Sequence, residues 1–584
     1  MTNAPDYRAY FLGPKSENQA WVRAELQAIL GHWFRWRKDQ FPDDMPSIAA
    51  EERQKAPYLA AREKMAHGLE YLNQMLEAEL PKFTPRYIGH MVSELALPAI
   101  MGHFAMLLHN PNNTCKGASK VGSQIEVEVI AMLAEMLGFD PNTATGHITG
   151  GGTVANFEAV WRARFRQDHW LSLLLFLAEE RDVKMNLFEG AHMGWERFKE
   201  LTALHSVPVD GLRSYSAVAS NPYEFGERMT AALGISYRGP VMLVPENKHY
   251  SWSKASNIFG YGEQAFWPIP IDSMGKADVA TLQELIEKAR SEQRPISMVV
   301  SVAGTTETGE IDPIDQTQGI LNAVLARHGV DIWHHVDAAY GGYMCSMLRG
   351  SKPNVLSAGN RAALGAIGQA HSVTIDPHKL GYVPYACGAL ITRDRNAYAV
   401  SGFAAPYLER HMDEPDKWST TLEGSRSAAG AAATWLTGKT LGFDGDGIGR
   451  VIADTILAAR QFKRDIETAL AYVHFLAPSD TNILCFSVAE HGWSLAKSNQ
   501  LTEAIFDRFD KCPDFSLSKT ALSAPAHSLM IKRHVSGFQG TVDDDKLHLL
   551  RCVFMNPFWQ DTEIAEKLTA EIIALIEAWF SEQN

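Results

Sequence analysis

Residues 371 to 385 read His371-Ser-Val-Thr-Ile-Asp-Pro-His-Lys-Leu-Gly-Tyr-Val-Pro-Tyr385, and this stretch decides how the rest of the chain is interpreted. Its first part is apolar and β-branched, which predicts a strand. The Gly- and Pro-containing part behind it predicts a turn. Lys379 therefore lies just past a strand end, directly after His378. A lysine in that setting can hold an aldehyde cofactor as a Schiff base, provided that its surroundings favour the neutral amine.

A second segment of this kind, His335-Val-Asp-Ala-Ala-Tyr-Gly-Gly-Tyr343, precedes the first. It places Asp337 at the end of an apolar strand, where a pyridinium nitrogen would need a carboxylate. Ala339, two residues on, shares the strand face and could pack under the ring. Together Lys379 and Asp337 suggest pyridoxal phosphate. Alone, either residue is equally compatible with an ordinary charged surface position.

A glycine-rich segment supplies a place for the phosphate. Gly146-His-Ile-Thr-Gly-Gly-Gly-Thr-Val-Ala-Asn156 leads into a predicted helix. Backbone N–H groups of a first helical turn point outward, and the helix dipole favours an anion. Gly151, Gly152 and Thr153 are the best donors. Many glycine-rich turns bind nothing, so this segment counts only in combination with the others.

Two further segments complete a possible cofactor site. In Glu246-Asn-Lys-His-Tyr-Ser-Trp-Ser-Lys-Ala255, His249 could lie flat on the pyridine ring, although a packed loop histidine is the simpler interpretation. Gly304-Thr-Thr-Glu-Thr-Gly-Glu-Ile-Asp-Pro313 is a strand-end turn whose hydroxyls, including that of Thr306, could orient the cofactor. Ordinary turn chemistry explains this second segment nearly as well.

The pattern around these segments predicts an α/β fold. Short apolar runs alternate with amphipathic stretches, which implies a mostly parallel sheet covered on both faces. The predicted strands are 241–244, 297–302, 332–337, 372–375 and 388–392, and the predicted helices between them are 281–292 and 316–328. In such sheets ligands gather outside the carboxyl ends of the strands, where Gly304, Asp337 and Lys379 fall.

The two ends of the chain follow other patterns. Residues 17–38 and 51–80 predict helices that either wrap a partner subunit or cap their own domain. After Gly424 a helical pattern runs to about residue 472. Alternating segments at 482–488 and 548–554 and a last helix at 561–580 follow, which predicts a smaller α+β domain with an antiparallel sheet.

Composition narrows the class of protein. At 584 residues the chain should form two or three domains. A net charge of −14 argues against nucleic acid as a partner. The start lacks a signal-peptide pattern, and the longest apolar run, 170–178, is far shorter than the ~20 residues of a membrane helix, so we expect no membrane partner. Six cysteines without Cys-x-x-Cys spacing favour a reducing cytoplasm.

In this order and spacing, the five segments resemble the group II pyridoxal-phosphate-dependent amino acid decarboxylases, which have the type I, aspartate-aminotransferase-like fold. The resemblance implies a large domain with a mostly parallel seven-stranded sheet and a small α+β C-terminal domain. One branch, the bacterial tyrosine decarboxylases, is the most similar. The segments that carry this finer resemblance are Arg86-Tyr-Ile-Gly-His-Met-Val-Ser-Glu94, His109-Asn-Pro-Asn-Asn113, Gly150-Gly-Gly-Thr-Val-Ala-Asn156, Thr374-Ile-Asp-Pro-His-Lys-Leu-Gly-Tyr-Val-Pro384 and Leu550-Arg-Cys-Val-Phe-Met-Asn-Pro557.

The resemblance also assigns roles. His90 would lie near the substrate side chain, and Arg551 would hold the substrate α-carboxylate. Ser425 would reach the phosphate of a neighbouring subunit, which makes a homodimer obligatory. Tyr407 would return a proton to Cα from a mobile catalytic loop. The implied division of the chain is 1–85 as an N-terminal helical, dimer-embracing segment, 86–400 as the cofactor domain, 401–423 as the loop and 424–584 as the small domain.

The sequence is compatible with several functions. L-Tyrosine or a related aromatic amino acid is the expected substrate, and aspartate or glutamate is the alternative. An acidic substrate would need a second cationic group, for which Arg86 is one candidate. An aminotransferase or lyase of the same fold would share Lys379 and Asp337, but the His-Lys pair and His249 favour decarboxylation. A non-catalytic protein on this fold would be expected to lose the lysine.

Overall fold

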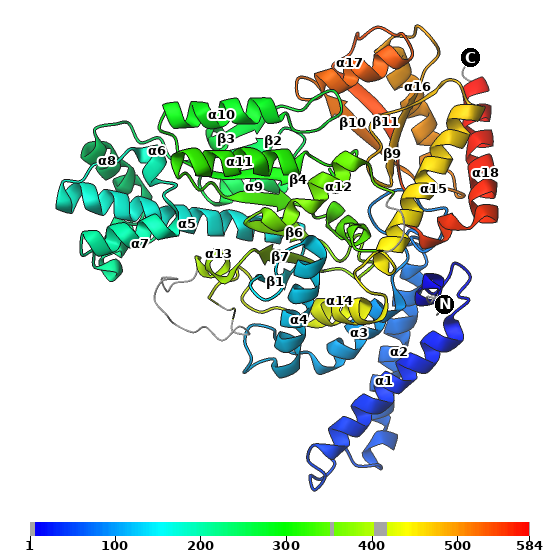
Figure 1. Ribbon diagram of the computed structural model, residues 1–584. Coiled ribbons are helices and arrows are strands. Elements are labelled where there is room, and N and C mark those ends of the chain that lie inside the picture. The colour runs from blue at the N-terminus through cyan, green and yellow to red at the C-terminus, as the bar shows by residue number, and fades with distance from the viewer. Residues whose placement is uncertain (1–5, 351–354, 402–416, 418, 583–584) are drawn as a thin grey trace.

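Two β-sheets organise the chain (Figure 1), whose computed structural model describes residues 6–350, 355–401, 417 and 419–582. The larger sheet has the strand order β1-β7-β6-β5-β4-β2-β3. Its strands are β1 (Thr145–Thr149), β2 (Val241–Pro245), β3 (Phe266–Ile269), β4 (Ile296–Val302), β5 (His334–Asp337), β6 (Ser372–Ile375) and β7 (Gly388–Thr392).

The larger sheet is mostly parallel. Strands β3, β2, β4, β5 and β6 pair in parallel, whereas β7 pairs antiparallel with both β6 and β1. Every residue of β2, β4, β5, β6 and β7 is buried, as expected for strands covered on both faces. Edge strand β3 contains Pro268, which an edge tolerates because no partner needs its N–H. The predicted seven-stranded, mostly parallel α/β sheet is confirmed.

Helices cover both faces of this sheet. On one face α10 (Val279–Ser291) and α11 (Ile314–His328) pack against Val299, and on the other α5 (Gly152–Arg181) and α9 (Ser251–Ile258) pack against Met298. Adjacent residues of β4 thus serve opposite faces, as the two-residue period of a strand requires. Further helices are α3 (Leu97–His109), α4 (Lys120–Leu137), α12 (Ala358–Gly365), α13 (Arg395–Ala399) and α14 (Ala429–Thr440), which packs against α3 and α4.

Helix α5 continues past the sheet into a helical lobe, at the left of Figure 1. The lobe contains α6 (Leu187–Gly190), α7 (Gly194–Leu204) and α8 (Pro222–Leu233). Their apolar side chains pack on the second half of α5 in two clusters around Trp170 and Leu174. The lobe therefore depends on the helix whose first turn is the predicted phosphate cradle.

The smaller sheet is antiparallel, with the order β10-β11-β9-β8. The elements of this region are α15 (Ile448–Ala469), β8 (Val473–Phe475), β9 (Ile483–Val488), α16 (Leu495–Asp510), β10 (Ser518–Ser523), α17 (Ser528–Gly537), β11 (Lys546–Val553) and α18 (Thr562–Ser581). An N-terminal segment joins it, because Tyr87 bridges to Ser516 and Ile88 is buried in the same core. This brings His90 beside the small sheet.

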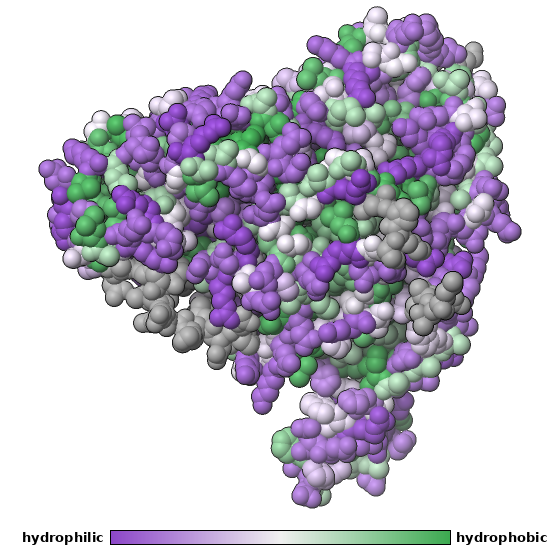
Figure 2. Space-filling view, in the orientation of Figure 1, coloured by the Kyte–Doolittle hydropathy of each residue, from purple (hydrophilic) through white to green (hydrophobic). Residues whose placement is uncertain are grey.

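The first two long helices project away from the two sheets, at the bottom of Figure 1. Helix α1 (Gln19–Asp39) and helix α2 (Ala56–Leu76) contain no buried residue in the single chain. Helix α2 begins five residues later than predicted, with Pro57 in its first turn, where proline is favoured. Figure 2 shows a mostly hydrophilic face on this projection and scattered hydrophobic side chains elsewhere. Among the described residues, no helix has the length and apolar character to cross a membrane.

Candidate active site

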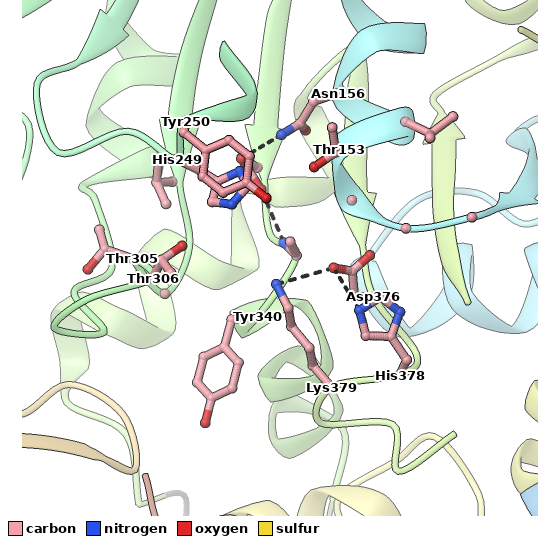
Figure 3. Close-up of a pocket in the computed structure, with 18 of the residues that line it drawn as sticks. Thr153, Asn156, His249, Tyr250, Thr305, Thr306, Tyr340, Asp376, His378 and Lys379 are labelled. Carbon is pink, nitrogen blue, oxygen red and sulfur yellow. Dashed lines mark hydrogen bonds and ion pairs between the residues drawn. The ribbon is translucent and has the colours of Figure 1, made fainter. Parts of the chain in front are cut away.

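A cavity of about 270 Å³ lies at the carboxyl ends of β4 and β5, beside the first turn of α5 (Figure 3). Nine of the residues predicted from sequence line it together. They are Gly151, Gly152, Thr153, His249, Thr306, Asp337, Ala339, His378 and Lys379. Segments separated by more than 200 residues in the sequence thus meet at one point, as the parallel topology predicts.

The glycines form a tight cradle at the start of α5. A Cβ on Gly152 would lie 2.9 Å from Oδ2 of Asp376, and a Cβ on Gly388 would lie 2.5 Å from the carbonyl carbon of Gly151. Gly151 has a φ of 151°, which side chains rarely adopt. The N–H of Gly150 donates to Oε2 of Glu423 at 3.1 Å. The glycines therefore line the cavity with backbone alone at the start of a 30-residue helix, which fits a phosphate group.

Asp337, at the end of β5, is 4% exposed and held by neutral donors. Its Oδ2 accepts from Nδ2 of Asn156 at 2.8 Å and from Nε1 of Trp252 at 3.0 Å. Its Oδ1 accepts from the backbone N–H of Ala339 at 3.3 Å. A carboxylate at this place, with one oxygen still short of donors, fits a protonated pyridine nitrogen.

Lys379 reaches the cavity from the turn after β6. Its Nζ lies 3.2 Å from Oδ2 of Asp376, and Nε2 of His378 lies 3.5 Å from the same oxygen. Asp376 is 2% exposed, and its Oδ1 has no hydrogen-bond partner among the described residues. Burial lowers the pKa of His378, so that this imidazole is neutral at pH 7. Figure 3 shows the lysine side chain pointing up toward His249.

His249 lies at the end of the cavity away from the Lys379 turn (Figure 3). Its Nδ1 is 2.9 Å from Oγ of Ser251, and the Tyr250 ring packs on it with a centroid distance of 4.0 Å. Burial lowers the pKa of His249, which keeps the ring neutral and suited to stacking. Ala339 lines the same cavity with only a methyl group.

The turn after β4 connects the cavity with the small domain. Nη2 of Arg551 donates to the carbonyl of Thr306 at 2.7 Å and its Nε to the carbonyl of Glu307 at 2.7 Å. Nη1 of Arg551 donates to the carbonyl of Gly89 and to Oγ of Ser518. Arg551 is 4% exposed and does not line the cavity, and neither does the exposed His90. Both lie behind the Thr306 side of the cavity.

Two other predicted residues stand apart. Ser425 is exposed, and its Oγ accepts from Nδ2 of Asn112 at 3.0 Å, outside the cavity of its own chain. A side chain that serves a neighbouring subunit would be exposed in this way. Tyr407 lies outside the described residues.

Several residues that line or support the cavity are not among those predicted from the sequence. Asp376 and Tyr385 belong to the segment around the lysine, so their nearness in sequence was the available signal. Trp252 had no such signal, because its indole donates to Asp337, which lies 85 positions further along the chain. Taken together, the cradle, the amine and the carboxylate fit pyridoxal phosphate, which needs a dianion site, a primary amine and a ring-nitrogen acceptor.

Known proteins with a similar sequence share this chemistry. Residues 227–489 match the pyridoxal-dependent decarboxylase conserved domain. The chain is 30% identical to an L-tyrosine decarboxylase of Enterococcus faecium over 99% of each chain, and 31% identical to one of Levilactobacillus brevis over 86% of this chain and 83% of the other. The crystal structure of mouse CSAD superposes with a TM-score of 0.62 at 19% identity, covering 95% of this chain and 99% of that one.

Proposed function

The chain belongs to the pyridoxal-dependent decarboxylases, and from this premise we propose that it converts L-tyrosine into its amine and carbon dioxide. Its cofactor is pyridoxal 5'-phosphate and its fold is the type I fold. The observation that carries the proposal is the meeting of Lys379, Asp337 and the Gly150–Thr153 cradle in one cavity.

Each part of the cofactor has a residue to hold it. The backbone N–H groups of Gly151, Gly152 and Thr153 bind the phosphate, helped by the dipole of α5. Lys379 attaches the aldehyde covalently through its amine. Asp337 keeps the proton on the ring nitrogen, because a carboxylate favours a neighbouring positive charge. When bound, the cofactor accepts the electron pair left on Cα as carbon dioxide departs.

Further residues orient the ring and the substrate. His249 and Ala339 would pack against the cofactor ring, and His378 and Thr306 line the same cavity. Arg551, behind the Thr306 side of the cavity, would hold the α-carboxylate through the one guanidinium N–H of five that its four protein acceptors do not use. His90 approaches the substrate side chain, and Tyr407 returns the proton to Cα.

The lining favours an aromatic amino acid over an acidic one. Among the described residues that line the cavity, Lys379 is the only lysine or arginine, so a second carboxylate would lack a charged partner. Tyr250, Tyr340 and Tyr385 line it as well, and aromatic rings pack favourably together. The L-tyrosine decarboxylases of Enterococcus faecium and Levilactobacillus brevis match over 99% and 83% of their own length. Aspartate and glutamate are not favoured.

We also propose a cytoplasmic homodimer divided as the sequence predicts. Helices α1 and α2 expose large apolar side chains in the single chain, including Trp21, Phe34 and Leu69, which a second copy would cover. Residues 1–85 would thus embrace the partner, and the exposed Ser425 would reach the partner's phosphate site. All six cysteines are free thiols, which supports a reducing compartment.

The test is a carbon dioxide assay across the twenty amino acids with the purified protein and added cofactor. We expect L-tyrosine to give the highest kcat/KM. Borohydride reduction should fix the cofactor on a peptide containing Lys379, and Lys379→Ala should lose both the label and the activity. Faster release from aspartate or glutamate would overturn the substrate, and a label on another lysine would overturn the role of Lys379.

A further inference from the structure

The two oxygens of the Asp337 carboxylate have different surroundings. Oδ2 accepts two side-chain N–H groups, from Asn156 and Trp252, whereas Oδ1 accepts one long backbone bond from Ala339. Both donors are almost completely buried, with Trp252 at 0% and Asn156 at 1% exposure. They come from different helices, α5 and α9, on the same face of the sheet. The carboxylate is therefore fixed by two independent elements.

The orientation of the Asn156 amide follows from its other contacts. Its Nδ2 also donates to Oγ of Ser251 at 3.0 Å, so that both amide hydrogens are used. Its Oδ1 then faces Nε2 of His335 at 3.3 Å, and because an amide oxygen only accepts, that nitrogen carries a proton. The amide cannot flip without losing these contacts.

The tautomer of His335 is set in the same way. Burial lowers the pKa of His335 to about 4, so the ring is neutral and carries one proton, at Nε2. Its Nδ1 must accept, and it lies 2.8 Å from Oγ of Ser372. Oγ of Ser372 in turn accepts from Nε1 of Trp333 at 2.9 Å. A continuous series of buried hydrogen bonds thus runs from Trp333 to Asp337. In each bond the donor is determined by the neighbouring bonds.

We propose that Trp252 and Asn156 are positioning residues for Asp337, which occupy Oδ2 so that Oδ1 is the oxygen presented to the ring nitrogen of the cofactor. This inference rests on the proposed function. Two neutral N–H donors also stabilise the charged carboxylate, the form that holds a proton on the ring nitrogen. Neither an indole nor an amide changes its protonation state near neutral pH, so both donors orient the carboxylate without competing for the ring proton.

Several ionisable side chains also lie near Asp337. His335 lies on the same strand and His249 precedes α9, and burial lowers the pKa of both imidazoles. Lys379, Asp376 and Lys254 are further charged groups that influence the pKa of His249. With both imidazoles neutral at pH 7, Trp252 and Asn156 are the side chains that donate directly to the carboxylate.

The test uses Trp252→Phe, which keeps an aromatic ring and removes the N–H. Trp559→Phe is the matched control, because Trp559 is 1% exposed and donates its indole N–H to the carbonyl of Pro85, in the small domain. Cofactor binding is titrated without substrate through the visible absorption of the bound cofactor. We expect Kd for pyridoxal phosphate to rise about tenfold in Trp252→Phe and to stay unchanged in Trp559→Phe.

The two kinetic constants separate positioning from mere packing. In the decarboxylation assay kcat should fall while KM for tyrosine stays, because Trp252 does not line the cavity. Asn156→Ala tests the same oxygen if Trp252→Phe does not fold. Its control is Asn499→Ala, because Asn499 of α16 is 5% exposed and its Nδ2 also donates to a carboxylate, that of Asp544.

The outcomes distinguish this inference from the function on which it rests. If the wild type binds no pyridoxal phosphate, or Lys379→Ala binds it as the wild type does, the proposed function fails. If the wild type binds it and decarboxylates tyrosine, but Trp252→Phe and Asn156→Ala titrate as their controls do, the positioning role alone is overturned.

Discussion

Lys379 is ion-paired within its own turn, with Nζ 3.2 Å from Oδ2 of Asp376. This amine must leave the ion pair before it can add to an aldehyde. Asp376 is buried, so solvent screens the pair only weakly. The free enzyme thus keeps its reactive amine occupied until a ligand competes for it.

Asp376→Asn should therefore speed the attachment of the cofactor. The amide keeps the shape of the side chain and removes its charge, and we expect the rate of pyridoxal phosphate addition at neutral pH to rise about tenfold. Stopped-flow absorption measures this rate. Asp561→Asn, which changes the distant cap of α18, is the control. A slower rate in Asp376→Asn would instead make Asp376 a base for the amine.

Glu423 lies where it competes with a phosphate. Its Oε2 accepts the Gly150 N–H at the start of α5, and burial raises its pKa. Glu423→Gln should bind pyridoxal phosphate about threefold more tightly. The gain should be present above the pKa of Glu423, where the wild-type carboxylate is charged and repels the phosphate. It should vanish below that pKa, where the carboxyl is neutral. Quenching of protein fluorescence measures Kd, and weaker binding at every pH would contradict the prediction.

The pair Glu126–Arg426 should be essential for stability. Both side chains are buried, with Nη1 2.5 Å from Oε1. Burial acts to raise the pKa of Glu126, but Arg426 and Lys417 outweigh it and lower this pKa to about 2. Arg426→Met should lower the free energy of unfolding by about 3 kcal/mol, because a buried charge loses its partner. Arg197→Met, in an exposed pair, should cost less than about 1 kcal/mol.

The same pair makes stability depend on pH in the acid range. Because the folded pKa of Glu126 lies below its unfolded value, its contribution is complete above about pH 4.5 and is lost as the pH falls toward 2. Glu126→Gln should remove that part of the acid sensitivity. Urea unfolding at a series of pH values measures how the free energy of unfolding depends on pH. The same dependence in the wild type and in Glu126→Gln would contradict the prediction.

Glu310 should have the opposite pH dependence. It is fully buried in the turn that carries Thr306, and burial raises its pKa to about 7. The folded protein favours the protonated carboxyl. The contribution of Glu310 to the free energy of unfolding is therefore complete below about pH 4.5 and is lost as the pH rises to 7. Glu310→Gln, which stays neutral, should therefore gain about 2 kcal/mol over the wild type between pH 5 and 8. Urea unfolding of both proteins at pH 5 and pH 8 tests this prediction. The same difference in free energy of unfolding between Glu310→Gln and the wild type at the two pH values would refute it.

The sequence pattern predicted the site residues that follow strands, but not those held by contacts between distant segments. Lys379 and Asp337 follow apolar runs whose parallel pairing brings their ends together, so pattern alone located both. Arg551 was assigned by family resemblance, and its acceptors, the carbonyls of Thr306, Glu307 and Gly89, belong to segments far apart in the chain. Contacts of that kind have no local pattern.

Two strands of the large sheet were missed for related reasons. Strand β1 (Thr145–Thr149) is short and polar, and its burial comes from pairing with β7. Strand β3 (Phe266–Ile269) contains a proline, which argues against a strand unless its edge position is known. In both cases tertiary context outweighs local preference.

The bonds of Arg551 suggest where the substrate range of this enzyme could be altered. Because Arg551 and Ser518 belong to the small sheet yet fix the carbonyl of Thr306 and the chain at Gly89, changes there would shift one wall of the cavity without replacing any residue in it. A mutant library restricted to the wall itself would miss them. Natural variants could acquire new substrates by the same route, through small-sheet positions such as Ser518 that do not line the cavity.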